Sequence, residues 1–214
     1  MKSIGRCIFI SRDLEGLSHS KQAKAALQGG LKHIQFRTKH LQYEQAVQEA
    51  KKIRTLCTDY GAFFTVNDEP HVAMECAADA VHLGLDDLPV SDARILVGSE
   101  MHIGGTCNTV ADVVDRVRSG VNYVGLGPYQ FTQTKQKLSP VLGLNGYVSI
   151  LSTLKTLHIE IPIFAIGGIH FTDITSLLQT GVQGIALSSA LGNTPDDIVQ
   201  NAKRLAQLLD TYEH

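Results

Sequence analysis

The sequence predicts an α/β protein that folds as a single (β/α)8 barrel, and three observations lead to this prediction. Short apolar runs rich in β-branched residues alternate with amphipathic stretches along the whole chain of 214 residues, which is typical of repeated βα units around a parallel sheet. Eight such runs occur, and eight parallel strands close a barrel. Their spacing of about 20 to 40 residues suits one strand, one loop and one helix each.

The eight apolar runs mark the expected strands. In order they cover residues 7–11, 33–38, 62–67, 80–85, 102–106, 123–127, 161–166 and 184–188. No linker, low-complexity tract or second domain interrupts the pattern, so we expect residues 1–214 to form one domain. An open doubly wound sheet is the weaker alternative, because no G-x-G-x-x-G turn follows the first strand.

The stretches between the strands carry helical periodicity. Within residues 43–60 the apolar side chains recur at intervals of three and four, which predicts a helix with one face packed on the barrel. The last helix is expected to start with Thr194 as N-cap and Pro195 at the first helical position. Asp196 and Asp197 would then complement the helix dipole.

Composition and charge narrow the classes of partner. Apolar residues make up 43% of the chain and charged residues 19%, as in a globular protein. The net charge of −2 provides no basic field for nucleic acid or for an anionic membrane. No apolar stretch approaches the roughly 18 residues that span a bilayer, and the first apolar run is too short for a secretory signal. We therefore expect a cytoplasmic protein that binds neither nucleic acid nor membrane.

The cysteines and histidines are scattered along the chain. No C-x-x-C or H-x-x-x-H pair occurs, so the spacing favours neither a zinc site nor a redox dithiol. We expect four isolated buried thiols, at Cys7, Cys57, Cys76 and Cys107. His82 and His102 lie inside expected strands, where packing and hydrogen bonds would satisfy them.

Candidate binding residues follow the second expected strand. In a parallel barrel the active site lies at the carboxyl ends of the strands. Because side chains alternate along a strand, Gln35, Arg37 and Lys39 are expected on one side. A surface salt-bridge ladder is the alternative. Helices cover the outside of a barrel, however, so cations at this spacing are expected to face its mouth.

Carboxylates follow the next two strands. Asn67 and Asp68 end the third strand, and Asp86 and Asp87 follow the fourth. Oxygen ligands next to cations suit Mg²⁺ bridged to substrate phosphates, since Mg²⁺ takes only one or two carboxylates and keeps waters. N-capping of the following helices by Asp68 and Asp87 explains the same residues equally well. The residues alone leave both interpretations open.

Later segments offer groups that bind phosphate. The polar loop after the sixth strand is long enough to be a lid and contains Thr132, Thr134 and Lys135. Two hydroxyls and an ammonium suit phosphate oxygens, although a solvated loop is the alternative.

The ends of the last two strands form the strongest physical signal in the chain. Gly168 frees backbone amides after the seventh strand, and Ser188 and Ser189 add hydroxyls after the eighth, as in the usual barrel site for a phosphate monoester. The mouth is thus expected to carry a metal-diphosphate half on strands two to four and a monophosphate half on strands seven and eight. Two phosphorylated substrates follow from this division.

Seven segments together resemble the thiamine phosphate synthase family across essentially the whole chain. They occur in order and at compatible spacing: QFRTK (35–39), VND (66–68), ADAVHLGLDDLP (78–89), IGGTCNT (103–109), VGLGPYQFTQTK (124–135), IPIFAIGGI (161–169) and GIALSSAL (184–191). No single motif is specific, since AIGGI occurs in several barrel families. The resemblance rests on all seven in register.

The resemblance implies a transferase that joins hydroxymethylpyrimidine diphosphate to thiazole phosphate and releases pyrophosphate. It implies that the pyrimidine diphosphate is held by Gln35, Arg37, Lys39, Asn67 and Lys135, and that Mg²⁺ is bound by Asp68 and Asp87. Thr106 would contact the pyrimidine. The thiazole phosphate would be held by Thr132, Thr134, Gly168, Ser188 and Ser189. A homodimer is compatible with the family.

The implied chemistry is dissociative. Diphosphate leaves, an electron-rich pyrimidine methyl cation forms, and the thiazole nitrogen captures it. The nitrogen already carries its lone pair, so neither a general base nor a protein nucleophile is needed, and the sequence offers no dyad or triad. Catalysis would come from preorganised positive charge around the leaving group, supplied by Mg²⁺, Arg37, Lys39 and Lys135.

The chain departs from the usual motifs at several positions. Phe36 and Thr38 stand where Leu and Glu are usual, and Thr106 stands in place of Ser. Asn108 replaces a His, and Phe131 replaces a Pro. These changes bear on substrate preference and efficiency more than on the reaction class.

Two alternative functions remain compatible with the resemblance. The thiazole tautomerase branch of the same barrel family lacks the diphosphate groups and uses a His where this chain has Pro128. A non-catalytic paralogue would bind thiamine phosphates as a sensor without turning them over. An assay with both substrates separates the three functions.

Overall fold

The computed structural model describes residues 4–131 and 140–211. Within these residues eight parallel strands alternate with eight α-helices, and the strand order β1 to β8 closes into a barrel. The predicted (β/α)8 fold class is thereby confirmed. No helix in the described part of the chain is long and apolar enough to cross a membrane.

The observed strands agree with the expected ones to within two residues at each end. They are β1 (Cys7–Ile10), β2 (His33–Phe36), β3 (Phe63–Asn67), β4 (Ala80–Leu83), β5 (His102–Cys107), β6 (Tyr123–Leu126), β7 (Ile163–Ile166) and β8 (Gly184–Leu187). The correction that matters for function concerns β2. It ends at Phe36, so Arg37 and Lys39 lie in the following loop and not on the strand.

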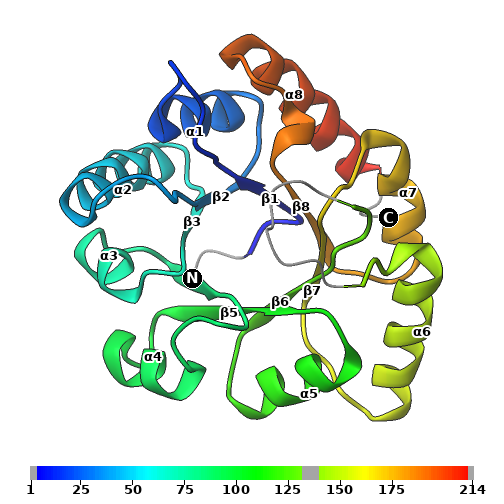
Figure 1. The fold of residues 1–214 in the computed structure, drawn as a ribbon. Coiled ribbons are helices and arrows are strands. Elements are labelled where there is room, and N and C mark those ends of the chain that lie inside the picture. Colours follow the sequence, from blue (N-terminus) through cyan, green and yellow to red (C-terminus); the bar gives the residue numbers. More distant parts are fainter. Residues whose placement is uncertain (1–3, 132–139, 212–214) are drawn as a thin grey trace. The chain divides into compact units, whose positions relative to one another are not determined.

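The helices occupy the stretches between the strands (Figure 1). They are α1 (His19–Gln28), α2 (Tyr43–Asp59), α3 (Pro70–Glu75), α4 (Val90–Val97), α5 (Val110–Arg118), α6 (Gly143–Thr156), α7 (Ile174–Gln179) and α8 (Pro195–Asp210), with short 3-10 turns η1 (Phe171–Asp173) and η2 (Ser189–Leu191). Thr194 caps α8 as expected, because its hydroxyl accepts a hydrogen bond of 3.2 Å from the Asp197 amide.

The elements group into two compact units. The first contains the described residues of Met1–Val81 and Leu187–His214. Here β1, β2 and β3 pair in parallel, with Phe9 opposite Ile34 and Ile34 opposite Phe64. Every residue of β1 and β2 is buried, as in a sheet covered on both faces. Helix α1 lies between α2 and α8, so segments from the two ends of the chain are side by side (Figure 1).

The second unit spans His82–Ala186. Strands β5, β6 and β7 pair in parallel, with Thr106 opposite Gly125 and Gly125 opposite Phe164. Tyr123 and Phe164 are fully buried and meet edge to face, with ring centroids 5.7 Å apart. Large aromatic side chains from neighbouring strands therefore fill this part of the core. That the whole chain forms one domain stays a prediction.

Candidate active site

The segment after β2 is held by two side chains from the segment after β1. The backbone amide of Arg37 donates to Ser11 Oγ (3.3 Å), and that of Lys39 donates to Asp13 Oδ2 (2.9 Å). The hydroxyl of Thr38 donates to Asp13 Oδ1 (2.8 Å). Side chains thus bind groups that a longer strand would have paired with its neighbours, and this explains why β2 ends before the segment.

Two predicted substrate-binding amides meet across β2 and β3. Gln35 is buried, with 3% of its surface exposed, and its side-chain nitrogen donates to Asn67 Oδ1 at 2.7 Å. Asn67 is half-buried at the carboxyl end of β3. The pair forms a fixed polar group at the strand ends, because each amide restrains the rotation of the other.

The predicted serines after β8 are connected to the end of β1. The hydroxyl of Ser188 donates to the carbonyl oxygen of Ile10 (2.8 Å), while the exposed Ser189 begins the η2 turn. The guanidinium of Arg12 donates to the carbonyl oxygen of Gly192, which ends that turn (3.0 Å). Arg12 therefore brings a cation to the segment that carries the two serines.

Asp68 follows β3 directly and has an unusual backbone conformation. Its φ angle is 66°, in a region that non-glycine residues rarely adopt, and the residue is half-buried. The N-cap residue of α3 is Glu69, and that of α4 is Pro89. The interpretation of Asp68 and Asp87 as N-caps is therefore wrong. Residues in sparsely populated conformations cluster at functional sites.

Asp87 is fixed by the loop after β4. Its Oδ2 accepts a hydrogen bond of 2.6 Å from the amide of Gly84. The carbonyl oxygen of Gly84 in turn accepts one of 2.5 Å from the guanidinium of Arg116 on α5. The backbone of a single residue, Gly84, thus connects Asp87 to Arg116. Asp68 belongs to the first unit and Asp87 to the second.

Thr106 lies on β5 and contacts a buried histidine from β4. Its Oγ1 lies 3.1 Å from His82 Nε2, and His82 is only 6% exposed. Glycine at position 104 makes room for the ring, because a Cβ there would lie 2.6 Å from His82 Nδ1. The expected hydrogen bond of His82 is thus present at Nε2.

Gly168 lies against the chain that leaves β6. Its φ angle is +71°, and a Cβ at this position would lie 2.9 Å from the carbonyl oxygens of both Gln130 and Phe131. The amide of Gln130 also donates to the carbonyl oxygen of Gly167 (2.9 Å). The glycine pair after β7 therefore supports the start of the long loop after β6. The predicted phosphate-binding residues of that loop lie outside the described residues: Thr132, Thr134 and Lys135.

The described residues contain no large cluster of metal-binding side chains. Within residues 4–131 and 140–211, no group of three or more His, Cys, Asp or Glu side chains is placed to hold a metal ion. A Mg²⁺ site needs fewer protein ligands, because this ion keeps several waters and takes one or two carboxylates.

Sequence reasoning missed the polar residues after β1. Ser11, Arg12 and Asp13 follow that strand directly, and the rule that selects strand ends applied to them as well. His19 was missed for a different reason. Its hydrogen bonds to Ser11 (2.8 Å) and Asp13 (3.1 Å) join α1 to this loop, and no local sequence pattern predicts such contacts.

Comparisons with known proteins agree on one family. The family model described as thiamine monophosphate synthase matches residues 7–191. A thiamine-phosphate synthase of Phocaeicola vulgatus is 43% identical over 200 residues, which cover 94% of this chain and 96% of that protein. The thiamine-phosphate synthase of Bacteroides thetaiotaomicron is 43% identical over 197 residues, or 92% and 94% of the two chains. The solved structure of a thiamine phosphate pyrophosphorylase from Pyrococcus furiosus covers 98% of both chains, with a TM-score of 0.85 and 27% identity.

Proposed function

Because the chain belongs to the thiamine monophosphate synthase family, we propose that it is a thiamine-phosphate synthase. This enzyme is a transferase that joins hydroxymethylpyrimidine diphosphate to thiazole phosphate and releases pyrophosphate. The observation that carries the proposal is the 43% identity to a thiamine-phosphate synthase over 94% of the chain.

The pyrimidine diphosphate would bind at the ends of β2 and β3. The paired amides of Gln35 and Asn67 offer donors and acceptors suited to a heterocycle. Arg37 and Lys39 supply positive charge for the diphosphate. Their backbone amides donate hydrogen bonds to Ser11 and Asp13, which hold this segment in place. Lys135 from the long loop would complete the cationic set, and Thr106 on β5 would contact the pyrimidine.

The ends of β7 and β8 would hold the thiazole phosphate. Ser188 and Ser189 contribute hydroxyls, and Gly168 allows close approach of backbone to the phosphate. Thr132 and Thr134 would add two further hydroxyls from the loop after β6. Phosphate monoesters bind at this place in many barrels.

Asp68 and Asp87 would hold Mg²⁺. Their carboxylate oxygens are the donors that Mg²⁺ prefers, and the two residues follow neighbouring strands in the barrel order. The hydrogen bond from the Gly84 amide to Oδ2 would orient the Asp87 carboxylate. Bound Mg²⁺ would neutralise part of the charge on the leaving diphosphate.

The protein's own residues would assist a dissociative reaction. The bond between the pyrimidine methylene carbon and the diphosphate oxygen breaks, and its electron pair leaves with the diphosphate. The same carbon then bonds to the thiazole nitrogen, which uses its own lone pair. No proton has to be removed, so the site needs neither a general base nor a nucleophile. Arg37, Lys39 and Lys135 act as preorganised charge where negative charge develops.

The partners of this enzyme are small molecules, and no nucleic acid or membrane enters the reaction. A cytoplasmic location follows from the proposed biosynthetic role. A homodimer is the oligomeric state that accompanies the proposal, and the mass of the protein in solution measures it.

The test is incubation of the purified protein with hydroxymethylpyrimidine diphosphate, thiazole phosphate and MgCl₂, with detection of thiamine phosphate and pyrophosphate. We expect product from wild type, and its loss in Asp68→Ala and Lys135→Ala. Lys155→Ala is the matched control, because Lys155 is an exposed lysine on α6. Isomerisation of the thiazole without coupling would identify a tautomerase instead. Binding of thiamine phosphate without turnover would identify a sensor.

A further inference from the structure

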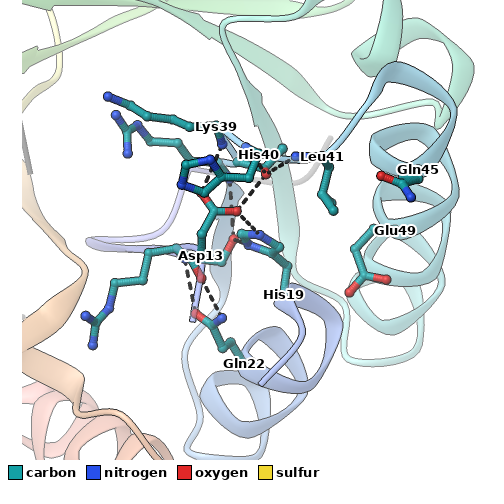
Figure 2. Close-up of polar contacts among 12 residues, drawn as sticks. Asp13, His19, Gln22, Lys39, His40, Leu41, Gln45 and Glu49 are labelled. Carbon is teal, nitrogen blue, oxygen red and sulfur yellow. Dashed lines mark hydrogen bonds and ion pairs between the residues drawn. The ribbon is translucent and has the colours of Figure 1, made fainter. Parts of the chain in front are cut away.

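The carboxylate of Asp13 binds three groups of the first unit at once. It accepts hydrogen bonds from the Thr38 hydroxyl (2.8 Å), the Lys39 amide (2.9 Å) and His19 Nε2 (3.1 Å). Figure 2 shows Asp13 between His19 and the segment that carries Lys39. Asp13 therefore connects the start of α1 to residues 37–39, which are expected to bind diphosphate.

His19 is fixed on every side. Its Nδ1 lies 2.8 Å from the hydroxyl of Ser11, which is fully buried, and only 5% of His19 is exposed. Its ring meets the ring of Phe36 edge to face, with centroids 4.9 Å apart. Phe36 is the last residue of β2, so His19 contacts the strand directly before the segment that Asp13 holds.

The acceptor character of Asp13 defines part of this network. Because Asp13 Oδ1 can only accept, His19 carries a hydrogen on Nε2 and donates it to Asp13. In the neutral ring Nδ1 then accepts from the Ser11 hydroxyl, whose oxygen also accepts from the Arg37 amide. Burial lowers the pKa of His19 and so favours this neutral form, against the opposing effect of Asp13.

Asp13 itself is ionised. Partial burial acts to raise its pKa, but hydrogen bonds from Thr38, Lys39 and His19 outweigh burial and lower the pKa below its ordinary value. An ionised carboxylate with three donors is a strong and directional anchor.

These residues do not form a nucleophilic triad. A serine nucleophile must reach its substrate, and Ser11 has no exposed surface. Its hydroxyl also serves as acceptor for the Arg37 amide. The three side chains are therefore positioned to hold a loop and not to attack a substrate.

The network around Asp13 adjoins an open space. A cavity of about 720 Å³ adjoins it, with Asp13, His19, His40, Leu41 and Glu49 among its lining residues.

The position of Asp13 itself is secured by a buried glutamine. The Gln22 side chain donates to the carbonyl oxygens of Arg12 (2.7 Å) and Leu17 (3.1 Å), and accepts from the Arg12 amide (3.1 Å). Only 1% of Gln22 is exposed. The segment before α1 is thus a rigid support for the segment after β2.

We propose that Asp13, oriented by His19, is a positioning residue that fixes residues 37–39 for diphosphate binding. The inference rests on the proposed function, because it takes Arg37 and Lys39 as the groups that bind the diphosphate. Asp13 acts through the backbone from which both cations extend and makes no contact with substrate.

The sign of the effect distinguishes positioning from simple electrostatics. Removing a negative charge near a diphosphate site strengthens diphosphate binding if charge alone matters. Removing the anchor weakens it. Asp13→Asn removes both the charge and one of the two acceptor oxygens, so a loss of affinity can only come from the anchor.

Four variants test the proposal by their KM for each substrate. Asp13→Asn is expected to raise the KM for pyrimidine diphosphate about tenfold, since charge-assisted bonds are lost. Thr38→Val is expected to raise it about threefold, because it loses one hydroxyl bond, and Thr38→Ser should restore the wild-type value. Glu15→Gln is the control, since it removes a charge from an exposed residue of the same loop. The KM for thiazole phosphate should change less than about twofold throughout.

Calorimetric binding of inorganic pyrophosphate, with and without Mg²⁺, gives a second measurement that needs no turnover. Weaker pyrophosphate binding in Asp13→Asn than in Glu15→Gln supports the positioning role, whether or not wild type couples the substrates. A wild type that binds pyrophosphate but does not couple the substrates would refute the proposed function alone. If wild type couples and Asp13→Asn keeps its KM, or if both KM values rise equally, the positioning role is overturned. A wild type that neither couples nor binds pyrophosphate overturns both.

Discussion

The side-chain nitrogen of Gln35 donates a hydrogen bond of 2.7 Å to Oδ1 of Asn67, and this bond joins β2 to β3 at their carboxyl ends. Gln35→Leu removes the donor from a nearly buried pair. We expect a loss of about 1 kcal/mol in the free energy of unfolding, together with a higher KM for pyrimidine diphosphate.

Urea unfolding and steady-state kinetics measure the two effects of Gln35→Leu. Gln207→Leu on α8 is the control, because it makes the same change at an exposed helical position. Equal effects in both variants would contradict a specific role for the pair.

Gly168 supports a second prediction, which separates backbone strain from steric clash. Gly168→Ala places a Cβ 2.9 Å from two carbonyl oxygens at a φ angle of +71°. Gly181→Ala also has a positive φ angle, +97°, but its Cβ would meet no atom within 4 Å. Each substitution should cost about 1 kcal/mol from strain, and Gly168→Ala should cost about 1–3 kcal/mol more from the clash.

Chemical denaturation of both glycine variants measures this difference. Because the carbonyls that oppose Gly168 belong to the start of the loop after β6, we also expect Gly168→Ala alone to raise the KM for thiazole phosphate. Stability losses of the same size in the two variants would show that the contact with Gln130 and Phe131 is not restrictive.

The sequence predicts the fold because the alternation of apolar runs and amphipathic stretches is local and repeated. It does not predict where β2 ends. The residues after Phe36 are compatible with a strand, but their backbone and side-chain donors bind Ser11 and Asp13 from another strand end. Such competition between side chains and the strand ladder depends on tertiary contacts, and hydrophobic periodicity carries no information about it.

The candidate site, like the fold, is predicted by the sequence only in part. The rule that strand ends carry function selects Gln35 and Asn67, which meet in the structure. It cannot separate metal binding from N-capping at Asp68, because both use an aspartate at the same place. The structure excludes N-capping, since the N-cap of α3 is Glu69, and metal binding by Asp68 stays a prediction. The rule does not select His19, because this residue lies on a helix and acts through contacts with distant residues.

The cysteines provide a prediction that needs no substrate. All four are buried, and burial raises the pKa to about 12 for Cys7, about 11 for Cys76 and about 12 for Cys107. Thiolates react with disulfide reagents and thiols do not, so these residues should react slowly at pH 8 in the folded protein. After denaturation all 4 cysteines should react. Rapid labelling of the native protein would contradict the burial of these thiols.

His19 gives a prediction for stability at mildly acidic pH. Burial lowers its pKa in the folded protein below the ordinary value of 6.5, so the unfolded chain binds the proton first as pH falls. Stability is therefore fully present above about pH 6.5 and declines as pH drops through the unfolded pKa toward the folded pKa. Asp13 and Glu49 lie close to His19, but the pKa values of both carboxylates are lowered from those of ordinary acids, so they titrate below this window.

His19→Gln removes the titrating ring but keeps an amide that can donate to Asp13. We expect this variant to be less stable than wild type at pH 7.5. It should also lose less stability between pH 7.5 and about pH 5, because residue 19 can no longer take up a proton in the unfolded chain. Urea unfolding across this range measures the slope, and His71→Gln on α3 serves as the exposed control. If the free energy of unfolding of His19→Gln changes with pH as that of wild type does, protonation of His19 does not reduce stability in this range. The fold then does not require a neutral ring at residue 19.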